Sequence, residues 1–235
     1  MMNFVNYIPI ATSVFSAYFF IQLLLHWLKD TSSIYLLWWM LGIFFYGAGT
    51  ATESIHATMG YMPANFKAWY IFGALLGAAP LAQGTVHLLL KTKFSDFLSY
   101  VLILTIIVVS VLVIRSPLVP GEHDKLGGYI LKWSYIRYIT PFINVYALIF
   151  LVGGAVYSAI LYARKGLYKK RMWGNILIAI GCLLGGIGGA GAKAGYIEVL
   201  YITEFVGILF IYAGYLMVKL SSEESIHPNQ SDAIA

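Results

Sequence analysis

The residues of this sequence best suited to chemistry are Glu53, His56 and Glu204, which lie in or beside long apolar segments. Glu53 and His56 stand three positions apart in GTATESIHATMG, residues 49–60, and side chains at that spacing share one face of a helix. A carboxylate beside an imidazole can exchange a proton or bind a metal. Glu204 lies within GYIEVLYITEFVGILF, where a carboxylate must be paired, protonated or in contact with a cavity. Their chemistry depends on where a membrane would place them.

The composition predicts a protein of the lipid bilayer. Of its 235 residues, 60% are hydrophobic and 11% are charged, and the mean hydropathy is +0.79. Soluble domains carry about 25% charged residues, so a chain this apolar could not keep its surface in water. The single cysteine, Cys182, excludes an internal disulfide and is typical of a small buried hydrophobic residue. The net charge of +5 follows from membrane orientation, and we expect no nucleic acid partner.

Seven segments are long and apolar enough to cross a bilayer, which takes about 20 residues each. The first lacks a basic n-region and a cleavage site, so we interpret it as a span rather than a signal peptide. We predict an all-α, polytopic membrane protein with a seven-helix transmembrane domain at residues 1–220 and a disordered cytoplasmic tail at 221–235. The predicted spans are 8–28, 34–56, 67–90, 97–115, 138–163, 172–192 and 197–219.

The lysines and arginines predict the orientation, because cytoplasmic loops carry an excess of them. With the N-terminus outside and the C-terminus inside, nine of these residues are cytoplasmic and six are external. The short loop ARKGLYKKR, residues 163–171, alone holds five of the nine. We therefore expect a multi-pass protein of the cell membrane, N-out and C-in, with the lipid bilayer as its first partner.

Aromatic pairs and one long loop mark the expected membrane boundaries. The motifs WY at 69–70, YILKWSYIRY at 129–138 and MW at 172–173 are typical of aromatic belts at the interface. WW at 38–39 lies about a turn inside its span and fits side-chain packing equally well. In the loop 116–137, the second half could lie flat on the membrane as an interfacial helix.

Small residues predict close contacts between helices. In the sixth span Gly181, Gly185 and Gly189 recur every four residues, which would leave one helical face without side chains. Gly73 and Gly77 repeat this pattern in the third span, and Pro80 and Pro141 are expected to bend their helices. Close packing is the main interpretation, and a hinge or a passage for a ligand is the alternative.

The depth of the acids suggests a site near the outer surface. Glu53 lies about 28 Å along its helix from the cytoplasmic start, while Glu204 lies about 10 Å below the outer surface. If the second and seventh spans are adjacent, Glu53, His56, Glu204 and Lys193 converge on one outer cavity. The alternatives are that Glu53 and His56 mark the wet end of a helix and that Glu204 braces its helix against a neighbour.

Metal and cofactor chemistry are weaker possibilities. Glu53, His56 and Glu204 could hold one zinc ion with water as the fourth ligand. Near the cytoplasmic side, His26 and His87 on facing helices could ligate haem, with Gln83 close by in the sequence. A retinal Schiff base is not expected, because the last span has no lysine before Lys219, and Lys193 stands at a helix end. Asn144 and Asn175 are interpreted as polar contacts between helices.

Three segments together resemble a group of uncharacterised bacterial seven-helix membrane proteins. They are FKAWYIFGALLGAAPLAQGTVHLLL, then FLVGGAVYSA with the basic loop and GNILIAIGCLLGG, and TEFVGILFIYAGYL. The shared order is W-Y-x-x-G-A-L, Q-G-T and G-G-A-x-Y-S over about residues 40–216. The resemblance implies a bacterial inner-membrane location and this topology, and it carries no activity or site residues with it.

The preferred hypothesis is a receptor-like sensory bundle that binds a small molecule or lipid in the outer cavity. Glu204 would be the buried charge partner, and the glycine face of the sixth span would allow movement. The alternatives are a small-solute transporter, a metal-dependent membrane enzyme, and a structural subunit whose basic loop docks a membrane protein partner. The sequence inclines against an enzyme, because no catalytic motif occurs in it.

Overall fold

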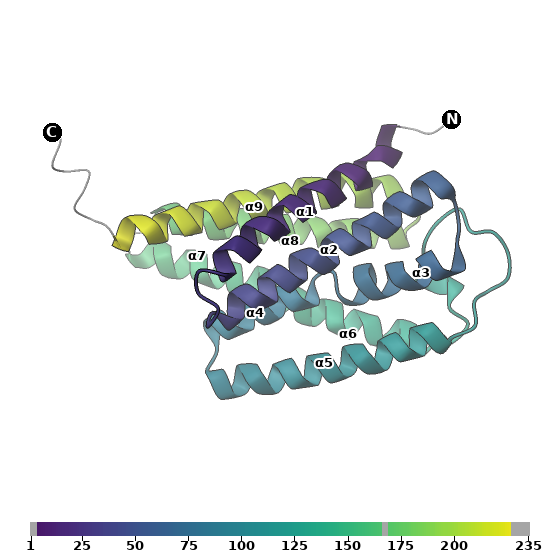
Figure 1. The fold of residues 1–235 in the computed structure, drawn as a ribbon, viewed down its shortest axis with the longest axis horizontal. Helices are drawn as coiled ribbons and strands as arrows, with labels where there is room; N and C mark the ends of the chain where they lie inside the picture. Colours follow the sequence, from purple (N-terminus) through teal and green to yellow (C-terminus); the bar gives the residue numbers. More distant parts are fainter. Residues whose placement is uncertain (1–3, 166–168, 227–235) are drawn as a thin grey trace.

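The computed structural model of the chain describes residues 4–165 and 169–226 (Figure 1). Apart from one isolated bridge, between Leu118 and Leu131, the regular structure of these residues is helical. The α-helices are α1 (Ile8–Trp27), α2 (Ile34–Met59), α3 (Pro63–Trp69), α4 (Ala79–Leu89), α5 (Thr92–Arg115), α6 (Ile136–Leu148), α7 (Gly154–Lys165), α8 (Lys169–Lys193) and α9 (Ile197–Ile226). The shorter elements are η1 (Phe4–Tyr7) and η3 (Gly128–Ile130), which are 3₁₀-helices, and η2 (Tyr70–Leu75) and η4 (Ile149–Gly153), which are π-helices.

These elements make seven spans, as the sequence predicts, and the protein is a multi-pass membrane protein. Among the described residues, seven helices are long and apolar enough to cross a membrane. Because the number is odd, the described chain starts and ends at opposite ends of the bundle (Figure 1). We call the end with residues 60–62, 116–135 and 194–196 the loop end. The other end, which carries Lys29, Lys91 and residues 164–165 and 169–171, is called the basic end.

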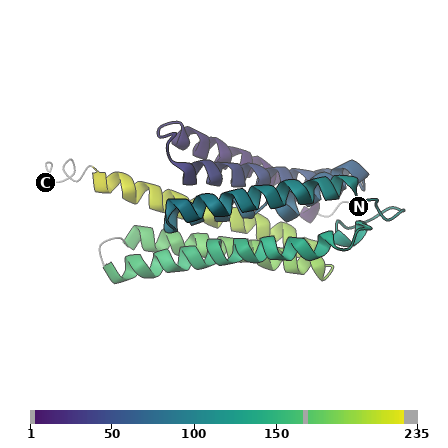
Figure 2. The same cartoon turned by 90° about the horizontal axis from the view of Figure 1, so that it is seen from below.

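The spans form an elongated ring of neighbours (Figures 1 and 2). Helix α1 packs between α2 and α9, α2 packs on α3 and α4, and α8 packs between α7 and α9. Helix α5 lies at the edge against α4 and α6 (Figure 1), and few of its residues are buried within the described chain. Such a helix suits lipid, and its most apolar window has a mean hydropathy of 3.0.

The third span is broken rather than merely kinked at the predicted proline. Helix α3 passes into the π-helix η2, a turn covers residues 76–78, and α4 begins at Ala79 with Pro80 in its first turn. Proline is tolerated there because the first turn of a helix does not use its N–H groups. Gly77 permits the break, since a Cβ at this position would lie 2.5 Å from the carbonyl oxygen of Gly73.

The fifth span is not interrupted at Pro141, where a bend is predicted from the sequence. Helix α6 continues through Pro141, and the irregular segment is η4, which starts eight residues later at Ile149. A π-helix inserts one residue per turn and changes which side chains face inwards, and such segments are frequent at functional sites. The third and fifth spans therefore both change register near the middle of the bundle.

Helices α8 and α9 meet along a glycine seam, but not along the predicted one. A Cβ on Gly181 would lie 2.5 Å from the carbonyl oxygen of Gly207, and a Cβ on Gly174 would lie 2.8 Å from that of Gly214. By contrast, Gly185 and Gly189 have open space around them within the described chain. The seam therefore repeats every seven residues, and Gly185 and Gly189 lie outside it.

Two expectations about the ends of the spans need correction. Helix α9 continues to Ile226, so the first part of the segment expected to be disordered is helical, and residues 227–235 lie outside the described chain. The long loop does not lie flat as a helix. Its residues Leu126, Ile130 and Leu131 are at most 5% exposed, because they pack against the bundle at the loop end.

Candidate functional site

The carboxyl groups of Glu53 on α2 and Glu204 on α9 face each other inside the bundle and interact. Glu53 is 3% exposed, and Glu204 is partly buried. The indole Nε1 of Trp69 donates a 3.0 Å hydrogen bond to Oε1 of Glu53, while Oε2 of Glu53 completes no hydrogen bond. Side chains of the second and seventh spans thus approach each other at these two acids.

Tyrosines hold this pair from both helices. The hydroxyl of Tyr46 on α2 donates a 2.8 Å hydrogen bond to the backbone oxygen of Glu204, which ties α2 to α9 below the acids. Tyr201, one turn before Glu204, is 3% exposed and lies close enough to both acids to feel their charge. Aromatic side chains from both helices therefore surround the acids.

His56 stands one turn above Glu53 on α2, under the long loop. It is 8% exposed, and its Nε2 lies 3.1 Å from the backbone oxygen of Asp124. A carbonyl oxygen can only accept, so Nε2 carries the proton in the neutral imidazole and Nδ1 is bare. Nδ1 is buried and has no hydrogen-bond partner. The site thus contains two buried acceptor atoms without donors, Oε2 of Glu53 and Nδ1 of His56.

The loop segment that covers His56 is fastened to the turn between α8 and α9. Nζ of Lys125 donates a 2.6 Å hydrogen bond to the backbone oxygen of Gly195, and the hydroxyl of Tyr129 donates to the backbone oxygen of Lys125. Lys193, predicted to join the acids, is exposed, and among the described residues no contact links it to Glu53, His56 or Glu204. The lysine that contributes to this region is therefore Lys125, which ties the long loop to the turn between α8 and α9.

The geometry offers little to a metal ion. In the part of the chain that the structure describes, no three His, Cys, Asp or Glu side chains form a group that could hold one. Nε2 of His56 already binds the backbone oxygen of Asp124 in the loop, and Oε1 of Glu53 already accepts a hydrogen bond from Trp69. The arrangement is better suited to holding and moving protons between neighbouring groups.

Gln83 and His87 belong to a separate polar network that joins three spans. Gln83 is 0% exposed, and its Nε2 donates to the backbone oxygen of Ser95 and to Oγ of Ser99. The hydroxyl of Tyr146 donates to its Oε1, and Nε2 of His87 lies 2.9 Å from Oγ of Ser99. Because these partners come from α4, α5 and α6, we interpret the network as a structural clamp.

His26 lies elsewhere, at the mouth of a cavity at the basic end. Its Nδ1 is 2.8 Å from the hydroxyl of Tyr215. The cavity has a volume of about 280 Å³ and is bounded by α1, α2, α4, α7, α8 and α9 together with η4. His26 and His87 thus bind separate partners on different helices.

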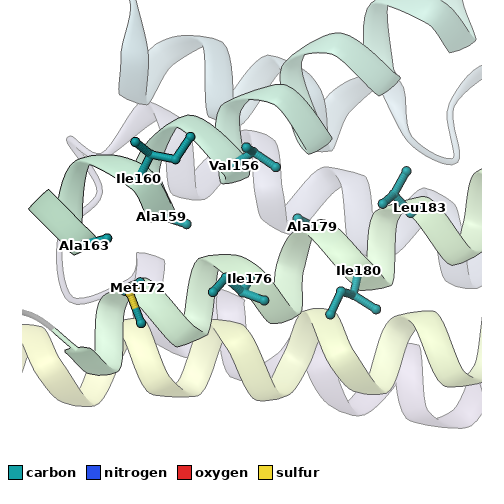
Figure 3. Close-up of a pocket in the computed structure, with 9 residues that line it drawn as sticks. All are labelled: Val156, Ala159, Ile160, Ala163, Met172, Ile176, Ala179, Ile180 and Leu183. Carbon is teal, nitrogen blue, oxygen red and sulfur yellow. The ribbon is translucent and has the colours of Figure 1, made fainter.

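A second hollow lies between α7 and α8 and is lined by apolar side chains alone (Figure 3). Its lining includes Val156, Ile160, Ile176 and Ile180, with Met172 at one end. A surface of this kind suits contact with acyl chains and contains no group for chemistry.

The two asparagines do not join helices as expected. Nδ2 of Asn175 donates to the backbone oxygen of Arg171 within its own helix, and the side chain lines the cavity at the basic end. Asn144 is exposed on the outer face of α6. Neither asparagine side chain therefore makes a hydrogen bond between helices among the described residues.

Sequence reasoning missed the aromatic partners of the acids. The WY motif is predicted to lie in an interfacial belt, yet the indole of Trp69 donates a hydrogen bond to Glu53. Tyr70 is 3% exposed, and its hydroxyl oxygen lies 2.8 Å from Oγ1 of Thr140. A usable signal was that a buried acid needs a donor and that Trp69 lies on the next helix. Tyr46 had no such signal, because its partner is a backbone oxygen.

The fold and this site define a seven-helix, multi-pass membrane protein with a buried pair of acids. No protein-family model matches the chain, and neither the curated proteins nor the solved structures give a significant match.

Proposed function

We propose that the protein is a receptor-like sensory bundle in which the proton is the small ligand of the loop-end site. The observation that carries this is the pair of facing carboxyl groups, Glu53 and Glu204, inside the bundle. Two negative charges that face each other away from water repel strongly, so such a pair holds a proton in common. Ionisable residues within a membrane span are functional candidates by default, and proton relays are one of their main uses.

His56 connects the protonation of this site to the long loop. In its neutral form the ring donates to Asp124 and has a bare, buried Nδ1 one turn from Glu53. A proton at Nδ1 adds a positive charge beside the acids and under the loop, which changes how strongly the loop is held. The sensory output in this proposal is therefore the position of the loop segment around Asp124 and Lys125.

Other titratable groups face the pair and must be accounted for in any pH experiment. Tyr46 on α2 and Tyr201 on α9 both lie close enough to feel the charge of the two acids, and Cys182 on α8 lies near Tyr46. Neither tyrosine loses its proton near neutral pH in an ordinary environment, so a change near neutrality does not come from these phenols.

The proposed orientation places the loop end outside the cell. The excess of lysine and arginine at the basic end supports a cytoplasmic location for that end. The paired acids would then respond to external pH. Single cysteines placed at Glu122 and at Ser222 in a Cys182→Ser background test the orientation. A membrane-impermeant maleimide should label intact cells at position 122 and not at position 222; the reverse pattern would place the loop end inside.

Infrared spectroscopy of the full-length protein in lipid vesicles tests the proton site. A protonated carboxyl group has a C=O stretching band that an ionised one lacks, so titration should reveal a shared proton. We expect Glu53→Gln and Glu204→Gln each to change this band and its pH dependence. Glu198→Gln is the matched control, because Glu198 lies on the same helix and is exposed. If the two buried variants titrate like wild type, the carboxyl pair is not the proton site.

The break in the third span supports a second candidate, a proton-coupled solute transporter. Discontinuous helices bind substrates in many transporters, and α3 and α4 are separated by residues 76–78. Ile43 on α2 and Ile208 and Ile211 on α9 belong to one buried core cluster, and along their helices they lie between the acids and the residues that line the basic-end cavity. We call these three residues the apolar layer. A transporter would have to open this layer. Solute-driven alkalinisation or acidification inside proteoliposomes would support transport, and its absence with an intact infrared titration would favour the sensor.

A further inference from the structure

The cavity at the basic end has the form of a site for a chain-like molecule. It lies among six of the spans, and most of its lining is apolar, including Leu36, Leu151 and Ile178. Leu88 and Leu89 of α4 line it and are 51% and 36% exposed. The cavity therefore reaches the lipid-facing surface beside α4, so an acyl chain could enter from the bilayer.

The polar part of this cavity contains donors and a cation. Lys219 on α9 lines it and is partly buried, and within the described chain it forms no hydrogen bond or ion pair. Trp39 also lines it, and its buried indole Nε1 has no acceptor. No Asp or Glu is among the described residues that line the cavity. An unpaired ammonium group in a cavity without acidic side chains is complementary to a negatively charged oxygen.

From this arrangement we infer that the basic-end cavity binds a single-chain amphiphile with an acidic head group. The chain lies against the leucine and isoleucine side chains, and the head group binds Lys219. Ligand pockets usually measure about 300–1,000 Å³, so a cavity of about 280 Å³ suits one chain and is too small for a two-chain phospholipid. The site is distinct from the acids at the loop end, because the apolar layer lies between them.

The shared chemistry of the ligand is an anionic oxygen on a single alkyl chain, and two kinds of molecule supply it. One is a fatty acid, which carries a carboxylate. The other is a single-chain lipid phosphate. The position of Trp39 offers a direct readout, because a bromine atom on a chain inside the cavity quenches its fluorescence.

The test uses full-length protein in a neutral detergent with three brominated probes: bromoundecanoate, bromoundecyl phosphate and bromoundecanol. The Trp39 signal is the part of the quenching that disappears in Trp39→Phe. We expect one or both acidic probes to saturate this signal at a concentration about tenfold lower than the alcohol does, since a hydrogen bond to a charged group contributes about that factor. Binding of the carboxylate alone identifies a fatty acid, and binding of the phosphate alone identifies a lipid phosphate.

Variants of Lys219 decide whether the head group is recognised as inferred. Lys219→Met should abolish the difference between the acids and the alcohol, while Lys219→Arg should retain it and show that the fold tolerates substitution. Lys29→Met is the matched control, because Lys29 is an exposed lysine at the same end and does not line the cavity. Equal binding of acids and alcohol by the wild type overturns the inference. The inference is also overturned if Lys29→Met loses the difference between the acids and the alcohol as fully as Lys219→Met does. Quenching that is unchanged in Trp39→Phe would overturn it as well.

Discussion

Trp69 and Glu53 are joined by a 3.0 Å hydrogen bond between the indole nitrogen and a buried carboxylate oxygen, across the turn from α2 to α3. Trp69 is the last residue of α3, and the π-helix η2 begins at the next residue. The change from α-helix to π-helix therefore occurs directly after the residue that binds the acid.

Removing this donor should destabilise the protein. Trp69→Phe leaves Oε1 of Glu53 buried without a partner, which we expect to lower the free energy of unfolding by about 1–3 kcal/mol. Unfolding can be followed in detergent by titration with dodecyl sulfate. Trp173→Phe is the control, because Trp173 is 54% exposed, and its effect should stay within about 0.5 kcal/mol. Equal effects of the two variants would contradict a role for this hydrogen bond.

The glycine seam predicts a sharp contrast between two substitutions on one helix. Gly181→Ala places a Cβ 2.5 Å from the backbone oxygen of Gly207, so α8 and α9 must separate, at a cost of about 1–3 kcal/mol. Gly185→Ala meets open space and should leave stability unchanged or raise it by up to about 1 kcal/mol. Thermal unfolding of both variants in the same detergent checks the contrast. A greater loss in Gly185→Ala would mean that the predicted four-residue repeat is the real packing face.

The Gln83 network should show energetic coupling between α4 and α6. Tyr146 donates to Oε1 of Gln83, so either Gln83→Leu or Tyr146→Phe breaks the same bond and leaves its partner unsatisfied. In a double-mutant cycle we expect a coupling of about 1 kcal/mol. Gln83→Leu combined with Tyr18→Phe should be additive, because Tyr18 binds Tyr212 and shares no partner with Gln83. Additivity of the first pair would mean that the contact contributes nothing.

The loop over His56 should loosen when Lys125 loses its hydrogen bond. Lys125→Met removes the donor to Gly195, so hydrogen exchange in residues 119–127 should become about threefold to tenfold faster. Global stability should change little, because the Lys125 side chain is exposed at the surface. Lys132→Met changes an exposed lysine in the same loop and should leave the exchange rates as they are. The prediction is wrong if both variants exchange alike.

The spans could be predicted from sequence because burial in lipid imposes long apolar segments on every helix. The predicted ranges match the described helices to within three residues, with three exceptions. The third span starts four residues earlier, at Pro63, the fourth starts five residues earlier, at Thr92, and α9 ends seven residues later, at Ile226. The approach of Glu53 to Glu204 could also be anticipated, because an acid in a span needs a partner and few polar side chains were available.

The remaining features depend on helix rotation, which an apolar sequence specifies weakly. When nearly every residue of α8 is apolar or glycine, the sequence does not show which glycines face α9, and Gly185 was assigned to the wrong face. The same holds for Asn144, which was expected between helices and lies on the outside. The π-helices η2 and η4 each shift the register of the residues that follow, which adds to this uncertainty.

The depth of the acids has an electrical consequence. Glu204 lies seven residues beyond the start of α9, or about 10 Å from that helix end, which is about a third of a 30 Å hydrocarbon layer. A proton that reaches it from the loop end crosses part of the transmembrane voltage. Moving one elementary charge across the whole membrane changes its electrostatic energy by about 2.3 kcal/mol per 100 mV. Moving a proton across a third of it would therefore change the free energy of proton binding by about 0.8 kcal/mol per 100 mV. A bundle that binds protons at this depth responds to membrane potential as well as to acidity.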